Sequence, residues 1–272
     1  MRSTRATALL QLQGATTQLP GRGFGPFDLT LTAGERVAIL GPSGAGKSTL
    51  LRLMAGERRA HGGQVALRGE PLAQWPAPQL AQRRAVLPQS HAVAFGMPVE
   101  LVVALGRIAR EPDRDQARIV TQALSAACAG HLAGRRFDTL SGGEQARVQL
   151  ARVLAQLWDV HEGLLLVDEP LAALDPGLQF ELMDALRDFA RTRNHALVAV
   201  LHDLNQALAG FDRLWLVQNG RLVGDLAAES GAVPALERLF AIRLRCIAIE
   251  HGRIAVLAGR ANTPAAVMGL TA

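Results

Sequence analysis

The sequence contains no tyrosine, only two cysteines and no apolar run long enough to cross a bilayer, which takes roughly 18–20 residues. Cys128 and Cys246 lie far apart and outside any CxxC or metal-ligand spacing, so we expect reduced thiols and neither a disulfide framework nor a zinc site. The apolar stretch that follows Arg5 ends at Gln11, which is too short for the core of a signal peptide. If a membrane is involved, another chain must supply the spanning segments.

Sequence repeats and low-complexity linkers are also missing, and charged residues make up only 19% of the chain. The formal net charge is +5, with basic clusters at 52–59, 83–84 and 107–118. Because no aromatic residues interleave with these arginines, a stacking platform for nucleic acid is not indicated, and a solvated basic surface explains them. The 49% of apolar residues excludes disorder, and 272 residues suffice for one large α/β domain.

Hydrophobic periodicity divides the chain into three parts. Short strand patterns dominate the first third, helical patterns dominate residues 89–157, and strands and helices alternate after that. The expected strands are 9–13, 27–31, 36–40, 65–67, 85–87, 164–167, 196–201, 214–217 and 221–223. The expected helices are 47–55, 99–108, 119–127, 144–157, 180–190 and 205–209. Buried apolar strands alternating with helices predict an α/β fold whose mainly parallel sheet is covered on both faces.

We expect residues 1–272 to form a single domain. Its core comprises about 1–88 and 158–230, an inserted helical subdomain comprises about 89–157, and a C-terminal extension comprises about 231–272. The extension has a helical start at 236–240 and then two alternating segments that suggest a small hairpin. We find no chemistry in its residues.

A glycine-rich segment after the strand at 36–40 fits the pattern G-x-x-x-x-G-K-[ST] without a mismatch. Its members are Gly41, Pro42, Ser43, Gly44, Ala45, Gly46, Lys47, Ser48 and Thr49. Glycines let backbone N–H groups approach an anion closely, and the following helix adds its N-terminus. We expect Lys47 to reach the β- and γ-phosphates of a nucleotide and Ser48 to place its hydroxyl on Mg²⁺. The sequence therefore predicts a P-loop that binds a nucleoside triphosphate.

Two carboxylates follow the apolar strand at 164–167. Ligands of α/β proteins lie at the carboxyl ends of parallel strands, so Asp168 and Glu169 should face the phosphate loop. Asp168 is predicted to hold Mg²⁺, and Glu169 to polarise the water that attacks the γ-phosphate.

A second anion site is predicted where Ser-Gly-Gly opens the helix at 144–157. Its residues are Leu140, Ser141, Gly142, Gly143 and Glu144. One chain then carries two phosphate-binding helix ends separated by nearly 100 residues in sequence. The economical geometry is a head-to-tail homodimer in which each ATP lies between Lys47 of one copy and Ser141 of the other, although simple capping of the helix by Ser141 would also explain the motif.

With these motifs in this order, the chain resembles the ATPases of ABC transporters over nearly its whole length. Gly41–Thr49 resembles the Walker A motif, 164–169 the Walker B motif and 140–144 the signature motif. Gln89, Asp175 and His202 resemble the Q-loop glutamine, the D-loop aspartate and the switch histidine. The resemblance implies a P-loop NTPase core with an antiparallel β subdomain and an inserted helical subdomain.

The resemblance also implies roles for individual residues. Glu169 and His202 would be catalytic, with His202 bonded to the γ-phosphate. Ser48, Gln89 and Asp168 would hold Mg²⁺, and Gln89 would link the site to a membrane partner. The cofactors implied are ATP and Mg²⁺.

One departure from the family pattern concerns the nucleobase. The family usually stacks adenine on an aromatic residue, often tyrosine, well before the phosphate loop, where this chain has Thr17 or Gln18. Phe24 is a possible substitute, and the contact is otherwise missing. Strong selectivity for adenine is therefore in doubt, and use of GTP should be tested.

Within the family, the chain is most similar to the ATPases of iron-chelate, haem and cobalamin importers. The segments that carry this similarity are 69–72, 84–89 and 148–158. Haem is favoured as cargo, with vitamin B12 and ferric siderophore as alternatives, and a soluble ABC ATPase acting on nucleic acid or ribosomes as a remote one. The resemblance implies two transmembrane permease subunits and, indirectly, a periplasmic solute-binding protein. It places the chain peripherally on the cytoplasmic face of the bacterial inner membrane. The stretch from Gln89 to Arg107, where we expect Phe95, Met97 and Pro98 to be exposed, is a natural dock for a permease helix, although ordinary core packing of Phe95 and Met97 would also explain these residues.

Overall fold

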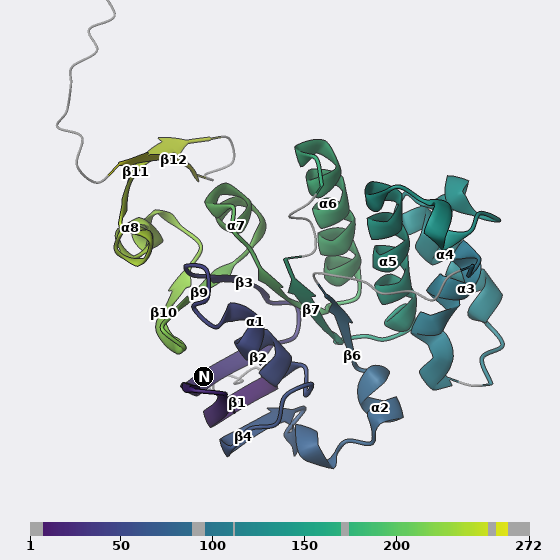
Figure 1. Cartoon of the computed structure of the whole chain (residues 1–272), viewed down its shortest axis with the longest axis horizontal. Helices are drawn as coiled ribbons and strands as arrows, with labels where there is room; N and C mark the ends of the chain where they lie inside the picture. The colour runs from purple at the N-terminus through teal and green to yellow at the C-terminus, as the bar shows by residue number, and fades with distance from the viewer. Residues whose placement is uncertain (1–7, 89–95, 111, 170–173, 250–253, 261–272) are drawn as a thin grey trace, which may run out of the picture.

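The computed structural model describes residues 8–88, 96–110, 112–169, 174–249 and 254–260. Its centre is a six-stranded sheet in the order β10-β9-β3-β8-β7-β6 (Figure 1). All of its strands run parallel except the edge strand β10, which pairs antiparallel with β9. The strands are β3 (Arg36–Leu40), β6 (Arg84–Leu87), β7 (Leu164–Asp168), β8 (Ala196–Val200), β9 (Arg213–Gln218) and β10 (Arg221–Ala227).

A second, antiparallel sheet has the order β2-β1-β4-β5. Its strands are β1 (Ala8–Leu19), β2 (Arg22–Thr32), β4 (Gly62–Leu67) and β5 (Glu70–Pro71). Helix α1 (Lys47–Met54) lies between this sheet and the parallel one, because its buried leucines pack with residues of both (Figure 1). The remaining α-helices that precede β7 are α2 (Ala77–Ala81), α3 (Val99–Ala104), α4 (Gln116–Ala126) and α5 (Gly142–Gln156).

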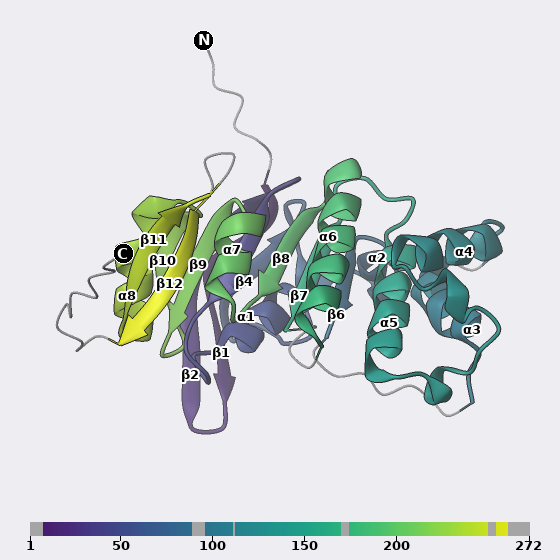
Figure 2. The same cartoon turned by 90° about the horizontal axis from the view of Figure 1, so that it is seen from above.

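Helices α6 (Pro176–Thr192) and α7 (Leu204–Gly210) cover the other face of the parallel sheet (Figure 2). Figure 2 also shows α3, α4 and α5 gathered at one end of the molecule. At the opposite end lie α8 (Val233–Phe240) and the antiparallel hairpin of β11 (Ile242–Ala248) and β12 (Ile254–Arg260). Among the described residues, no helix combines the length and the apolar character that crossing a membrane requires.

Alternation along the central strands explains their continuous apolar sequences. Val37 and Ile39 of β3 belong to the core shared with α1 and the antiparallel sheet, whereas Ala38 and Leu40 belong to the core under the other helices. Successive side chains of a strand point to opposite faces, so a strand covered on both faces needs apolar residues at every position. The predicted α/β class, with a mainly parallel P-loop core, an antiparallel sheet and a helical region, is confirmed.

Several predicted elements differ in extent. Strands β1 and β2 extend beyond the predicted segments and meet at a two-residue turn, since glycines and register shifts let a long, irregular hairpin continue through positions that break the alternation. The helix expected over 99–108 is divided into α3 and a 3₁₀ segment, Leu105–Arg110. Helix α2 was not predicted, because its five residues are too few to show a helical period.

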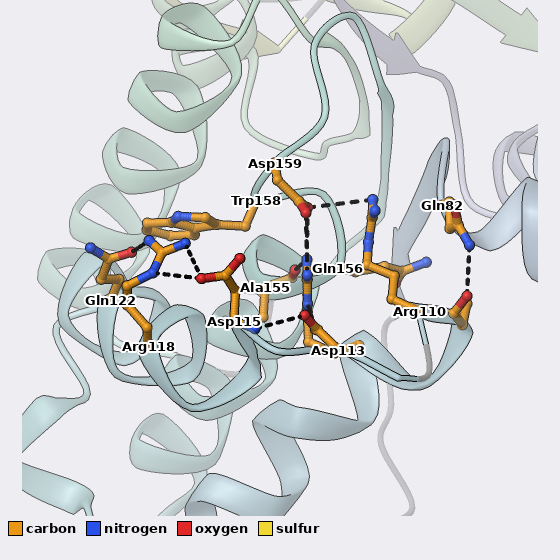
Figure 3. A network of polar contacts seen from close by, with 12 residues as sticks. Gln82, Arg110, Asp113, Asp115, Arg118, Gln122, Ala155, Gln156, Trp158 and Asp159 are labelled. Atoms are coloured by element: carbon orange, nitrogen blue, oxygen red, sulfur yellow. Dashed lines mark hydrogen bonds and ion pairs between the residues drawn. The ribbon is translucent and has the colours of Figure 1, made fainter.

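The 3₁₀ segment carries a buried arginine, Arg107, whose side chain is 1% exposed. Its Nε donates to Asp113 at 2.7 Å, its Nη1 donates to Asp159 at 2.7 Å, and Nη1 also donates to the carbonyl of Ala155 at 3.1 Å. These partners connect the segment before α4 with the end of α5, and Figure 3 shows Asp159 above and Asp113 below the contacts that join them. The guanidinium therefore holds three segments of the helical region together.

Replacing this arginine should destabilise the protein strongly. Arg107→Ala leaves the buried carboxylate of Asp113 without its arginine partner, whereas the more exposed Asp159 keeps Arg110, and breaking a buried pair costs about 3–5 kcal/mol. Urea denaturation would measure the loss. Arg118→Ala is the matched control, since Arg118 bonds Asp115 in an exposed pair (Figure 3) that should contribute less than about 1 kcal/mol. Equal losses in the two variants would contradict the role given to Arg107.

A fully buried histidine, His195, precedes β8. Its Nδ1 accepts a hydrogen bond from the N–H of Gly163 at 2.8 Å, and its ring lies 5.3 Å from that of Phe189. Burial, reinforced by the charge of Arg193, lowers the pKa of His195 to about 4. The folded protein therefore holds this imidazole neutral.

The low pKa of His195 predicts that the protein loses stability in mild acid. In the unfolded chain His195 takes up a proton near pH 6.5, whereas in the folded chain it does so only near pH 4. The contribution of neutral His195 to the free energy of unfolding is therefore complete above about pH 6.5 and falls as the pH drops toward 4. The loss should approach about 3 kcal/mol. In His195→Asn, whose Oδ1 can still accept from Gly163, urea unfolding between pH 7 and 4 should depend less on pH, while the exposed His61→Asn should follow the wild type. A His195→Asn profile parallel to the wild type would refute this account.

Candidate functional site

The phosphate loop connects β3 to α1 at the carboxyl edge of the parallel sheet. Lys47, the first residue of α1, is 5% exposed, and its Nζ donates to the carbonyls of Gly41 at 2.9 Å and Pro42 at 3.2 Å. Burial lowers the pKa of Lys47, while the nearby carboxylates of Glu169 and Asp168 oppose that change. The ammonium group is thus bent back over the loop, where an anion would meet it and the backbone N–H groups together.

The conformation of the loop depends on two glycines. Gly46 has φ 105°, and a Cβ on it would lie 2.8 Å from two ring atoms of Phe24. Gly44 has φ 72°, but a Cβ there would meet nothing within 4 Å. The chain therefore needs glycine at 46 for backbone conformation and for space, and at 44 for conformation alone.

A distant turn anchors the same loop. The N–H of Gly220, in the turn between β9 and β10, donates to the carbonyl of Ala45 at 2.8 Å. The carbonyl of Gly220 accepts from the N–H of Gly25 at 2.7 Å. Phe24, 5% exposed, packs against both Gly46 and Gly220. The phosphate loop, β2 and the β9–β10 turn thus form one hydrogen-bonded unit.

Asp168, the last residue of β7, and Glu169 lie next to the loop, because β3, β8 and β7 are parallel strands in consecutive positions of the sheet that end at the same edge. Ser48 Oγ donates to Asp168 Oδ1 at 2.8 Å, and burial raises the pKa of Asp168 against the effect of this hydrogen bond. Glu169 Oε1 lies 2.6 Å from Nε2 of His202 and 3.8 Å from Nζ of Lys47. Glu169 has φ 45°, an uncommon conformation for a residue other than glycine, and such conformations cluster at functional sites.

Lys47, Ser48, Glu169 and His202 line one pocket of about 490 Å³, and Asp168 contacts it through Ser48. The pocket-lining residues are Leu19, Pro20, Arg22, Phe24, Ser43, Gly44, Ala45, Gly46, Lys47, Ser48, Thr49, Glu169 and His202. The end of the pocket at the phosphate loop therefore offers the ammonium group of Lys47 and N–H donors. The other end, at the turn between β1 and β2, offers apolar side chains and the guanidinium of Arg22. That division suits a nucleoside triphosphate. The Ser48 hydroxyl and the Asp168 carboxylate are hard oxygen donors of the kind that Mg²⁺ takes alongside substrate phosphates, so the site also fits this ion.

The predicted second anion site lies elsewhere in the chain. Ser141 caps α5 in a capping box, with its Oγ accepting from the N–H of Glu144 at 3.3 Å and its own N–H donating to Glu144 Oε2 at 2.7 Å. Arg135 bonds the same carboxylate at 2.6 Å. None of Leu140, Ser141, Gly142, Gly143 or Glu144 is among the pocket-lining residues.

The remaining predicted residues are divided between described and undescribed segments. Asp175 caps α6, accepting from the N–H of Leu178 at 3.0 Å. Gln89 and Phe95 lie outside the described residues. Met97 is half-buried against the larger core, and Pro98 is exposed.

Sequence reasoning missed three pocket-lining residues, Leu19, Pro20 and Arg22. Thr17, one of the two positions compared with the family's aromatic residue, is fully buried and donates to the carbonyl of Arg59 at 3.2 Å. Gln18, the other, is not among the pocket-lining residues. The available signal was the Pro20-Gly21 pair, which marks a turn between two strand patterns.

A family model described as "ABC transporter" matches residues 24–172. The chain belongs to the ABC transporter family. It is 49% identical over 211 residues to the Hemin import ATP-binding protein HmuV of Pseudomonas aeruginosa, covering 77% of this chain and 80% of that protein. It is 45% identical over 223 residues to the protein of the same name from Gloeobacter violaceus, covering 79% and 80%. The chain is therefore an ATP-binding and ATP-hydrolysing transporter subunit that works with membrane permease components.

Solved structures agree with this ABC ATPase fold. A metal-chelate type ABC transporter in an inward-facing conformation superposes with a TM-score of 0.77 at 24% identity, covering 92% of this chain and 97% of that one. A nucleotide-free ATP-binding cassette from an ABC transporter superposes with a TM-score of 0.72 at 19% identity, covering 86% and 95%. At these identities the similarity concerns the fold alone.

The two loop glycines provide a test of how the phosphate loop is supported. Gly46→Ala should destabilise the protein through its positive φ and by displacing the ring of Phe24, whereas the control Gly44→Ala meets only the strain, about 1–2 kcal/mol. The free energy of unfolding of Gly46→Ala should be lower than that of Gly44→Ala by about 1–3 kcal/mol, because a packed ring must move. Urea unfolding of the two variants measures this difference. Equal stability of the two variants would mean that Phe24 does not support the loop.

Proposed function

We propose that this chain is the ATPase subunit of a hemin importer. The observation that carries the proposal is the identity of 45–50% to curated relatives named Hemin import ATP-binding protein in several bacteria. The ATPase does not itself meet the cargo, so the assignment depends on this similarity and not on the site. In such a system the chain lies peripherally on the cytoplasmic face of the inner membrane, with two permease subunits and, indirectly, a periplasmic solute-binding protein.

We assign the phosphates to the loop at 41–49 and to Lys47. The observations in support are the buried ammonium of Lys47, the glycines that leave room beside it, and the position of both at a helix N-terminus. Mg²⁺ would be held by Ser48 and Asp168, with Gln89 completing the set, and when bound it would neutralise charge on the β- and γ-phosphates.

Glu169 is proposed as the residue that accepts a proton from the attacking water. Its carboxylate lies within reach of His202, and both side chains line the pocket beside Lys47. His202, 51% exposed, would donate to the γ-phosphate through Nε2, the atom that contacts the carboxylate of Glu169 in this structure. Proton abstraction at Glu169 and charge stabilisation at Lys47 would then occur on the same side of the triphosphate.

A second copy of the chain is proposed to complete the site. In support, the pocket contains none of residues 140–144, although these form a capped helix N-terminus suited to an anion. A head-to-tail dimer brings Ser141 of the partner copy to the triphosphate, with Asp175 at the junction. Binding of ATP would favour the closed dimer, and hydrolysis would release it.

The permease is proposed to dock on the outer surface of the helical region that follows Gln89 in the sequence. The surface there includes three large apolar side chains: Leu101, 48% exposed, Leu105, 38% exposed, and Ile108, 63% exposed. They recur at intervals of four and three residues, so they lie along one side of α3 and the 3₁₀ segment. Exposed apolar side chains grouped in this way are typical of interaction surfaces.

Glu169→Gln should retain ATP binding but lose turnover. Removing the proton acceptor is expected to reduce the rate about 10²–10⁴-fold while the phosphates remain bound, so ATP should trap a dimer that size-exclusion chromatography detects. In the control Lys47→Ala, ATP should neither bind tightly nor induce the dimer. Turnover at the normal rate in Glu169→Gln would rule out Glu169 as the base.

Reconstitution tests the cargo. The chain would be assembled in proteoliposomes with its permease and solute-binding protein, and ATP hydrolysis would be compared with hemin, cobalamin or a ferric siderophore on the binding protein. Stimulation by hemin is expected. Stimulation of ATP hydrolysis by cobalamin or the siderophore alone would identify that compound as the cargo in place of hemin. ATP hydrolysis that depends on nucleic acid instead of a permease would overturn the proposal.

A further inference from the structure

We propose that Arg22 is the residue on which the nucleobase stacks, and that the site consequently accepts adenine and guanine with similar affinity. This inference rests on the proposed assignment of the triphosphate to the loop at 41–49. It concerns the opposite end of the pocket, for which no residue has been assigned.

The pocket continues from the phosphate loop to the turn between β1 and β2. There it is lined by Leu19, Pro20, Arg22 and Phe24. A nucleotide whose phosphates lie at Lys47 must place its base outside the loop, and this turn supplies the other wall of the same pocket. The chain has no tyrosine to offer a base.

Phe24 is the aromatic residue in this wall, but its ring is already engaged. It is 5% exposed, and its atoms lie against Gly46 and Gly220, where even an added methyl group would collide with it. Moving the ring outward to stack on a base would open a void beneath the phosphate loop. Phe24 therefore supports the site from below.

Arg22 lies directly over that ring. Its Cζ is 5.1 Å from the centroid of Phe24, and its Nη1 donates to the carbonyl of Gly44 at 2.9 Å. The ring and the hydrogen bond to the loop restrain an exposed side chain that would otherwise be free to rotate. A planar guanidinium held in place over an aromatic ring can receive a base, since unpaired bases stack on arginine planes as well as on aromatic rings.

Stacking of this kind explains the expected lack of selectivity. A guanidinium plane interacts with the π-face of a purine and not with its edge, and adenine and guanine differ at their edges. The other side chains here, Leu19 and Pro20, are apolar and carry no hydrogen-bonding group that could distinguish the edges. The class of ligand is therefore a nucleoside triphosphate recognised by the π-face of its base, with ATP and GTP bound alike.

Calorimetric titration of the purified chain with Mg²⁺ and the β,γ-imido analogues of ATP and GTP tests the inference, with inorganic tripolyphosphate as a ligand without a base. Wild type should bind the two analogues within roughly threefold of each other. Arg22→Ala should weaken both by about 5- to 100-fold and leave tripolyphosphate unchanged. Arg22→Lys should resemble Arg22→Ala, because an ammonium group has no plane, and Arg22→Tyr should restore tight binding of ATP.

The control Arg118→Ala removes an exposed arginine of α4 and should change none of these affinities. Loss of tripolyphosphate binding in Arg22→Ala would mean that Arg22 acts on the phosphate end, directly or through its bond to Gly44, and would overturn the stacking role. Unchanged binding of both analogues would mean that Arg22 contacts no base. A preference of wild type for one purine above tenfold would refute the lack of selectivity. Failure of wild type to bind either analogue or tripolyphosphate would instead refute the assignment of the triphosphate to the loop.

Discussion

The site is organised around one buried positive charge, the ammonium group of Lys47. A charge removed from water is costly unless other groups solvate it, and here two carbonyls of the phosphate loop do so, with Glu169 at a greater distance. Those carbonyls can be reached only because the loop curls around the side chain, which requires glycine at 46. The carboxylates after β7 then face the same group because parallel strands end at one edge of the sheet. The positions of loop, helix and acidic pair all follow from accommodating this charge.

Sequence alone gave the class of fold and much of the pocket, for identifiable reasons. The continuous apolar run ending in Asp168 is short, as is typical of a strand buried on both faces, and the phosphate loop has a fixed spacing that a single chain reveals. The division of the helix at Leu105 was not predictable, because both halves share the same apolar period. The network of Arg107 joins positions 107, 113 and 159, and no local pattern relates residues so far apart.

The end of the pocket proposed for the base shows a second reason why sequence comparison alone could not predict the site. Comparison by position with the family placed Thr17 or Gln18 where an aromatic residue usually stacks on the base. In the structure β1 continues to Leu19, and its register shifts turn the side chain of Thr17 inward. Such irregularities depend on how β1 pairs with both β2 and β4, which residues 8–19 alone do not encode. Phe24 could be recognised as an aromatic residue near the loop, whereas its engagement beneath Gly46 required knowledge of where Gly220 lies.

The hydrogen bonds of Gly220 have a consequence for the energetics of ligand capture. The N–H of Gly220 bonds the carbonyl of Ala45, and its carbonyl bonds the N–H of Gly25. These bonds hold the loop in its curved shape without any contribution from a ligand. Little conformational entropy then remains to be lost on binding, and more of the interaction energy appears as affinity. A residue more than 170 positions downstream thereby governs the preorganisation of the loop, so natural variation in that remote turn would tune nucleotide affinity without altering any contacting side chain.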